Sequence, residues 1–115
     1  MSYMLLILEP HEHRGTRSPV EGREFYQRML DFTASLRKRD LLIASDSLKR
    51  QAVRFAKHEG TARLLDGPFT ESKELIGGFF LLDCKTQEEA LLLAKECPAA
   101  EWATIEVREV GPCYD

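Results

Sequence analysis

The sequence predicts an α+β fold of the ferredoxin-like type, in which two β-α-β units share one antiparallel sheet. Three observations predict it. Apolar strand-like runs and two amphipathic helical segments follow one another in the order β-α-β, β-α-β. A segment at about residues 51–65 alternates between apolar and polar side chains around a glycine turn, which indicates a β-hairpin inserted between the two units. The 115 residues fit one domain, so we expect a single domain over residues 1–115.

The first half of the chain supplies a strand and a well-marked helix. Residues 3–8 form a continuous apolar run, typical of a strand covered on both faces. We expect the polar segment 9–17 to be a loop. Ser18 and Glu21 have capping-box spacing and Pro19 suits the first helical position, so a helix begins there. The residues at spacings of four, three and four along its apolar face are Phe25, Met29, Phe32 and Leu36.

The middle of the chain reads as a second buried strand followed by the hairpin. The strand is predicted at residues 41–44. Residues 53–57 then alternate as a half-exposed strand does, 58–60 supply the turn, and 61–65 return. The tripeptide 66–68, Asp-Gly-Pro, ends the hairpin because its residues favour a sharp turn.

The last part repeats the strand-helix-strand pattern. Residues 79–82 are an apolar strand, and Thr86 with Glu89 predicts a second capping box. Pro98 ends the helix, and residues 104–110 alternate as the final strand. The inner face of this helix is predicted to consist of Ala90, Leu93, Ala94 and Cys97.

The two central strands predict a partner. Two helices can cover only one side of a four-stranded sheet, yet residues 3–8 and 79–82 are apolar at consecutive positions. An uncovered apolar sheet face is a large patch, and such patches mark interaction surfaces. We therefore expect a homodimer that packs sheet against sheet.

Composition excludes several classes of function. The net charge of −3 is spread along the chain without a basic face, which argues against nucleic acid as a partner. The three cysteines have no C-x-x-C spacing, which argues against a disulfide framework and for a cytoplasmic protein. No run approaches the roughly 20 apolar residues of a membrane span, and the apolar start lacks the basic region of a signal peptide. No motif for a cofactor is present.

Candidate functional residues concentrate between Asp66 and Glu74. The Asp-Gly-Pro turn has a structural explanation, and we expect Phe69 to anchor it in the core. The Gly77-Gly78 pair that follows predicts a close backbone approach or a bulge. If the protein is a catalyst, the carboxylates of Asp66, Glu71 and Glu74 are candidate general acids or bases, with Lys73 as their charge partner. The alternative is a solvated, charged turn that serves folding alone.

A second group surrounds His11 and His13. With Glu9 and Glu12 they could bind a divalent metal if all side chains converged, since imidazole and carboxylate suit zinc. The favoured interpretation is a solvated loop without a metal. Asp46 and Ser47 follow the second strand, either as turn residues or at the rim of a cavity. Trp102 is expected to be a packing residue.

The segment around the turn resembles the DGPF-type branch of the YCII-related family. The resemblance lies in Asp66-Gly67-Pro68-Phe69, Lys73-Glu74 and Gly77-Gly78, and extends over the chain through 3–7, 97–99 and 105–108. It implies a dimeric α/β barrel. It also implies kinship with small enzymes acting on aromatic or lactone-like compounds, and relatives encoded beside alternative sigma factors. Some relatives carry a His-Asp dyad on the first helix, but residues 19–40 here contain no histidine, and Arg28 lies near its expected position.

Two hypotheses of function follow. The first is a small enzyme without a tightly bound cofactor that performs acid–base chemistry, such as isomerisation, elimination or hydrolysis, on a small organic molecule. The second is a ligand-binding or regulatory module without catalysis, linked to sigma-factor signalling. The absence of the helix-one histidine favours the second, and the charged group at Asp66, Glu71, Lys73 and Glu74 favours the first.

Overall fold

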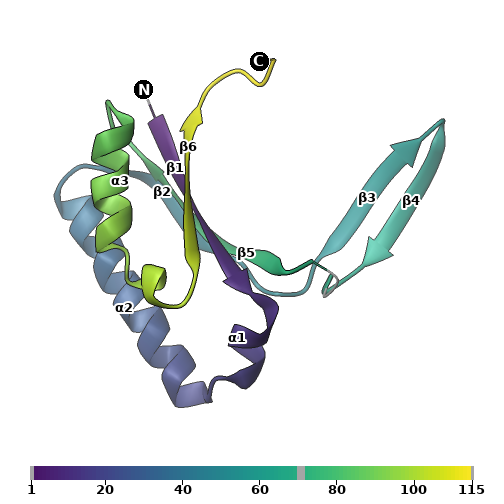
Figure 1. Ribbon diagram of the computed structural model, residues 1–115, viewed down its shortest axis with the longest axis horizontal. Coiled ribbons are helices and arrows are strands. Elements are labelled where there is room, and N and C mark those ends of the chain that lie inside the picture. The colour runs from purple at the N-terminus through teal and green to yellow at the C-terminus, as the bar shows by residue number, and fades with distance from the viewer. Residues whose placement is uncertain (1, 70–71, 115) are drawn as a thin grey trace.

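A four-stranded antiparallel sheet forms the centre of the protein, in the strand order β2-β5-β1-β6 (Figure 1). The computed structural model describes residues 2–69 and 72–114. The sheet consists of β1 (Ser2–Pro10), β2 (Leu42–Ser47), β5 (Glu74–Leu82) and β6 (Thr104–Val110). Helices connect β1 to β2 and β5 to β6. The two strands of each connected pair run parallel to each other, with β5 between β1 and β2 and with β1 between β5 and β6. This is the predicted ferredoxin-like arrangement.

Two helices cover one face of this sheet. Figure 1 shows α2 (Pro19–Lys38) and α3 (Gln87–Glu96) on the same side, followed by the short 3₁₀ helix η1 (Pro98–Glu101). The predicted capping box at Ser18 is present: its hydroxyl accepts from the Glu21 amide at 3.1 Å, and the Glu21 carboxylate accepts from the Ser18 amide at 3.0 Å. Thr86 caps α3 in the same way, but the Glu89 carboxylate binds the Lys85 amide instead of closing the predicted second box.

The core lies between the helices and alternate residues of the central strands. In β1, Tyr3, Leu5 and Ile7 are buried, whereas the residues between them are only half-buried. Phe32 of α2 packs edge-to-face on Phe80 of β5, with ring centroids 5.2 Å apart. Among the described residues, the far face of the sheet has no layer over it. It carries Met4, Leu6, Leu8, Phe79 and Leu81.

Two sequence predictions about this sheet are wrong. Residues 9–17 are not a loop, because β1 continues to Pro10 and α1 (His11–Thr16) follows at once. Glu9 stays in the sheet opposite Leu75, and an ion pair described below compensates its charge. The strand predicted at 41–44 is β2, which runs to Ser47 and is not buried. It lies at the edge of the sheet, and Ile43 is 52% exposed.

The predicted hairpin is present and projects away from the sheet (Figure 1). It consists of β3 (Val53–His58) and β4 (Thr61–Asp66), joined by a tight turn in which Glu59 and Gly60 both have positive φ, 50° and 80°. The sequence predicted a half-exposed hairpin, but every residue of both strands is exposed. None of the described helices is long and apolar enough to cross a membrane.

Candidate functional site

A cavity of about 260 Å³ lies between α2 and the sheet. Residues at helical spacing on one face of α2, from Gly22 through Phe25 and Met29 to Thr33, form one wall. The end of β1, the end of β2 and the glycine pair of β5 form the other. Charged side chains at the cavity are Glu9, Arg14, Arg17, Arg37 and Asp46. A polar cavity with an apolar wall is the general form of a small-molecule site.

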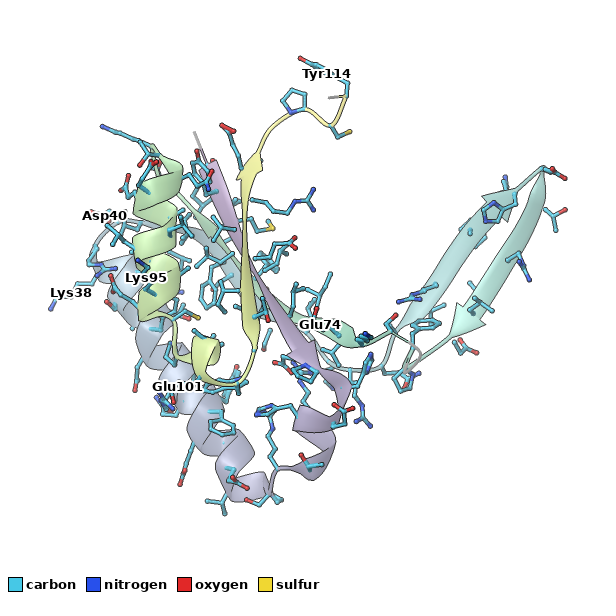
Figure 2. All side chains as sticks on the ribbon, viewed as in Figure 1. Lys38, Asp40, Glu74, Lys95, Glu101 and Tyr114 are labelled. Atoms are coloured by element: carbon cyan, nitrogen blue, oxygen red, sulfur yellow. The ribbon has the colours of Figure 1, made fainter. Side chains whose placement is uncertain are left out.

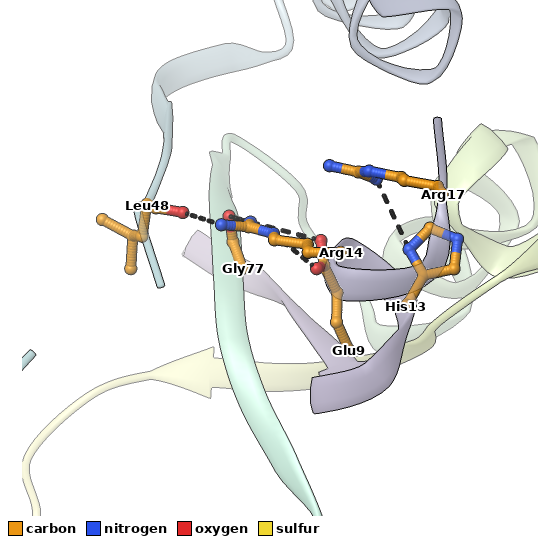
Figure 3. Close-up of polar contacts among 6 residues, drawn as sticks. All are labelled: Glu9, His13, Arg14, Arg17, Leu48 and Gly77. Carbon is orange, nitrogen blue, oxygen red and sulfur yellow. Dashed lines mark hydrogen bonds and ion pairs between the residues drawn. The ribbon is translucent and has the colours of Figure 1, made fainter. Parts of the chain in front are cut away.

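A largely buried ion pair between Glu9 and Arg14 lines the cavity and is drawn in Figure 3. Arg14 Nε donates to Glu9 Oε2 at 2.8 Å, and Nη2 lies 3.4 Å from Oε1. The same guanidinium donates from Nη1 to the Leu48 carbonyl at 2.6 Å and from Nη2 to the Gly77 carbonyl at 3.1 Å. Glu9 is 6% exposed. One side chain of α1 therefore joins the ends of three strands, and we call Glu9, Arg14 and their two carbonyl partners the Arg14 clamp.

A glycine is needed beside this clamp. The pairing of β1 with β5 shifts between Ile7 and Leu8, so that Gly77 is the extra residue of a β-bulge. A Cβ at Gly77 would lie 2.6 Å from Glu9 Cδ and 3.0 Å from Arg14 Nη2. The Gly77-Gly78 pair predicted a close backbone approach or a bulge, and both are present. Gly77 is the bulge residue beside the Glu9 carboxylate, and a Cβ at Gly78 would lie 2.9 Å from the Asp46 carbonyl oxygen.

An aromatic cluster stands beside the clamp. Phe25 of α2 and Trp102 lie with ring centroids 4.4 Å apart, and the His13 ring is parallel to the Trp102 ring within 3° at 6.0 Å. The Arg28 guanidinium lies over the Trp102 ring, 5.6 Å from its centroid, and is ion-paired with Glu101. Arg28 therefore contacts this cluster from the exposed side of α2.

His13 lies in the electrostatic field of Arg17. Arg17 Nη1 is 3.4 Å from His13 Nδ1 (Figure 3). The Arg17 guanidinium also lies 5.7 Å from the Phe25 centroid. Burial lowers the pKa of His13 below its usual 6.5, and the cation of Arg17 lowers that pKa further. His13 is therefore neutral near pH 7, and a neutral imidazole can accept a proton.

The residues predicted from the turn lie away from this cavity. Asp66 ends β4 and Lys73 precedes β5; both are exposed, and neither lines the cavity. Glu74 begins β5 near the base of the hairpin (Figure 2) and lines a second hollow. Glu71 lies outside the described residues. A catalytic role for these four residues stays a prediction.

Phe69 anchors the turn by burial, as predicted, but at the base of the hairpin and outside the main hydrophobic core. That side chain is 8% exposed, and the Arg54 guanidinium lies 3.9 Å from its ring centroid. The Gly67 amide donates to the Ala52 carbonyl at 2.6 Å, and a Cβ at Gly67 would lie 2.9 Å from the Phe69 ring. The Asp-Gly-Pro-Phe turn therefore fastens the base of the hairpin.

The histidine pair does not converge on one site. His13 belongs to the aromatic cluster, whereas His11 lines the second hollow. Over residues 2–69 and 72–114, no group of three or more His, Cys, Asp or Glu side chains is arranged to hold a metal ion. Asp46 and Ser47 belong to β2 and line the main cavity. Of their two predicted roles, the one at the rim of a cavity is therefore the one the structure supports. Trp102 packs as predicted, and it also lines that cavity.

Comparison with known proteins places the chain in a family. The model of the YCII-related domain matches residues 1–113. The protein belongs to the YCII-related family. It is also 42% identical over 45 residues to an uncharacterised protein of Rhizobium meliloti (strain 1021). That alignment covers 39% of this YCII-related chain and 36% of the relative, which is about a third of the relative's length.

Sequence reasoning missed Arg14 and Arg17 as site residues of this YCII-related protein, and it considered Glu9 only as a possible metal ligand. The available signal was a carboxylate directly after a buried apolar run, five residues before an arginine. A charge at the end of a central strand needs a partner, and the glycine pair 77–78 marked where a backbone would come close.

The clamp predicts a selective effect of Gly77→Ala. The added methyl group must displace Glu9 or Arg14, so we expect a loss of about 1–3 kcal/mol in unfolding free energy, as for other overpacked interiors. Urea unfolding followed by circular dichroism measures it. Gly111→Ala is the matched control, because a Cβ there has no described atom within 4 Å. Equal unfolding midpoints for the two variants would contradict this account of Gly77.

The position of Arg17 predicts the titration of His13. We expect the His13 ring to titrate below pH 6.5, and Arg17→Gln to raise its pKa without restoring the ordinary value, since burial is the larger cause. Proton–nitrogen NMR of the imidazoles measures this, with His11→Gln and His58→Gln variants for assignment. A His13 pKa at or above 6.5 in the unchanged protein would contradict it. Because unfolding restores a higher pKa, the His13 contribution to stability is full above pH 6.5 and falls as the pH drops below it.

Proposed function

We propose that this YCII-related protein binds a small organic anion with a planar group in the α2 cavity and performs acid–base chemistry on it. The observation that carries the proposal is the grouping of a neutral imidazole, an arginine and a buried carboxylate around one aromatic wall. Glu9, Arg17 and the two aromatic rings line the cavity, and the His13 ring packs against those rings beside it. The set therefore supplies an anion-binding group, a stacking surface and a neighbouring proton acceptor. The family and the Rhizobium relative leave the reaction open.

The side chains fit separate roles. Arg17 suits the carboxylate of the ligand, because its guanidinium is bound only weakly to His13, at 3.4 Å. Phe25 and Trp102 suit a planar group. His13 then serves as the base that takes a proton from the carbon or hydroxyl next to the anionic group, becoming an imidazolium that can return it. Isomerisation and elimination both begin with such a step.

Arg14 has a different role in this proposal. Its Nε and both Nη atoms already bind protein oxygens, so it holds Glu9 and does not bind the ligand. Glu9 in turn places a compensated negative charge at the cavity, which favours the imidazolium formed in the proton transfer. Because the Arg14 guanidinium is fully engaged, the clamp leaves few free groups for chemistry. This favours the alternative function, a ligand-binding or regulatory module linked to sigma-factor signalling.

Binding is tested with benzoate and the intrinsic fluorescence of Trp102. This is the single tryptophan of the chain and it lines the cavity, so a bound aromatic acid should change its emission. We expect saturable binding that weakens about tenfold or more in Arg17→Ala, the loss of one charge-assisted hydrogen bond. Arg63→Ala on the exposed hairpin is the matched control and should bind as the unchanged protein does. Equal binding by both variants contradicts the role of Arg17.

Catalysis is tested by exchange of solvent deuterium into phenylpyruvate, a carbon acid that carries a planar ring and a carboxylate. Proton NMR in D₂O should show exchange above the uncatalysed rate, lost in His13→Gln while benzoate binding persists. Binding without exchange supports the alternative module. Asp66→Asn and Lys73→Gln serve as a second arm: loss of exchange in these variants, with His13→Gln active, would move the site to the turn.

We further propose that the chain forms a homodimer through the open face of the sheet. That face presents Met4, Leu6 and Leu8 beside Phe79 and Leu81, all only half-buried. An apolar sheet face of this extent is stabilised when a second sheet packs on it. The expected assembly is the dimeric α/β barrel.

The dimer is tested by introducing a charge at the centre of that face. Leu6→Glu should lower the sedimentation mass from dimer to monomer at micromolar concentration, because burying an unpaired carboxylate is costly. Leu92→Glu is the matched control, since Leu92 is 61% exposed on α3, away from the open face. A monomeric unchanged protein, or dimers in both variants, would remove the proposal.

A cytoplasmic location completes the proposal. Cys84, Cys97 and Cys113 are all free. Burial raises the pKa of Cys97 to about 11, so that thiol is unreactive at neutral pH. Free thiols are typical of a reducing compartment.

A further inference from the structure

A second hollow, of about 540 Å³, lies beside the segment that joins β2 to the hairpin. Residues 48–52 of this segment form one side, and the first residues of β5 form the other. His11 at the start of α1 and Phe69 of the turn complete the wall. The hollow is distinct from the α2 cavity, and the Arg14 clamp connects the two. Leu48, whose carbonyl accepts from Arg14, lines the second hollow and not the first.

The charges around the hollow are mostly positive. Three cations, Lys49, Arg50 and Arg54, face one carboxylate, Glu74. Arg54 is engaged over the Phe69 ring and near the Ser72 hydroxyl. Lys49 and Arg50 form no ion pair within the described part of the chain. Two neighbouring cations without a described counter-ion at a concave surface attract an anion.

His11 provides an independent observation. Both of its ring nitrogens are buried, and neither has a hydrogen-bond partner among the described residues. An unpaired buried polar group destabilises a folded protein, and in native structures such groups call for a water, an ion or a ligand. Because His11 lines the hollow, an anion bound there is the candidate partner for its ring.

The remaining wall is apolar. Leu48, Phe69, Leu75 and Ile76 line the same hollow as the cations, and Ile76 is 50% exposed. Such a wall suits the hydrocarbon part of a ligand whose charged end meets Lys49 and Arg50. We propose that this hollow is a second binding site, which takes an organic oxyanion, a carboxylate or phosphate monoester with an apolar body. The proposal is independent of any chemistry in the α2 cavity.

Phenyl phosphate is the probe, and calorimetry measures its binding to the full chain. We expect saturable binding that weakens about tenfold or more in Arg50→Ala and in Lys49→Ala, since each removes a charge-assisted contact. Lys57→Ala is the matched control, because Lys57 is an exposed cation on the hairpin that does not line the hollow. Thermal melts confirm that the variants fold, since both replaced side chains are exposed.

The NMR signals of the histidine rings distinguish ligand binding from a purely structural role of these cations, which would not change them on addition of the probe. The ring signals of His11 should shift with phenyl phosphate while those of His58, on the exposed hairpin, stay unchanged. Inorganic phosphate should bind about tenfold more weakly because it lacks the apolar body.

Three outcomes would overturn the inference. One is an equal loss of affinity in Lys57→Ala, which indicates general attraction to positive charge. Another is saturation without any change at His11. The third is a loss in Arg17→Ala with none in Arg50→Ala, which assigns the probe to the α2 cavity. Failure of the benzoate experiment leaves this result unaffected, because the two sites share neither Arg17 nor Arg50.

Discussion

The structure of the candidate site depends on one buried charge, the carboxylate of Glu9 at the end of the central strand. An isolated carboxylate at 6% exposure would be costly, and Arg14 removes that cost with two contacts to it. The same guanidinium binds the carbonyls of Leu48 and Gly77. Because one planar group serves three strands, the position of α1, the bulge of β5 and the exit of β2 are all fixed together.

The two hollows follow from this arrangement. Holding α1 against the strand ends places His13 beside Phe25 and Trp102 on one side, and His11 beside residues 48–52 on the other. A site built on strand ends and a short clamped helix is held more precisely than one on a free loop. The Asp-Gly-Pro-Phe turn contributes indirectly, because Phe69 and Arg54 fasten the hairpin and thereby the segment that lines the second hollow.

Short-range sequence signals correctly predicted where helices and turns begin and end. The Ser18–Glu21 capping box, the glycine of the hairpin turn and the proline after α3 are short-range effects, and the structure confirms each. The failures lie where a distant partner decides. A polar segment such as 9–17 looks like a loop until Arg14 meets Leu48 and Gly77, more than thirty residues away in sequence. The apolar residues 41–44 predicted a buried strand, but local sequence does not show that β2 lies at the edge of the sheet.

The sequence by itself determined the order of elements, the ferredoxin-like topology and the resemblance to the YCII-related family, because hydrophobic period, capping and turn chemistry are written in consecutive residues. It also marked the glycine pair as a place of close approach. Only the tertiary structure decided which charged residues share a cavity. It moved attention from the Asp66–Glu74 turn to Glu9, Arg14 and Arg17 at the cavity and to His13 beside it, since convergence of side chains from separate elements depends on packing. The physical reason is that a buried ion pair is chosen by three-dimensional neighbours, which spacing along the chain does not specify.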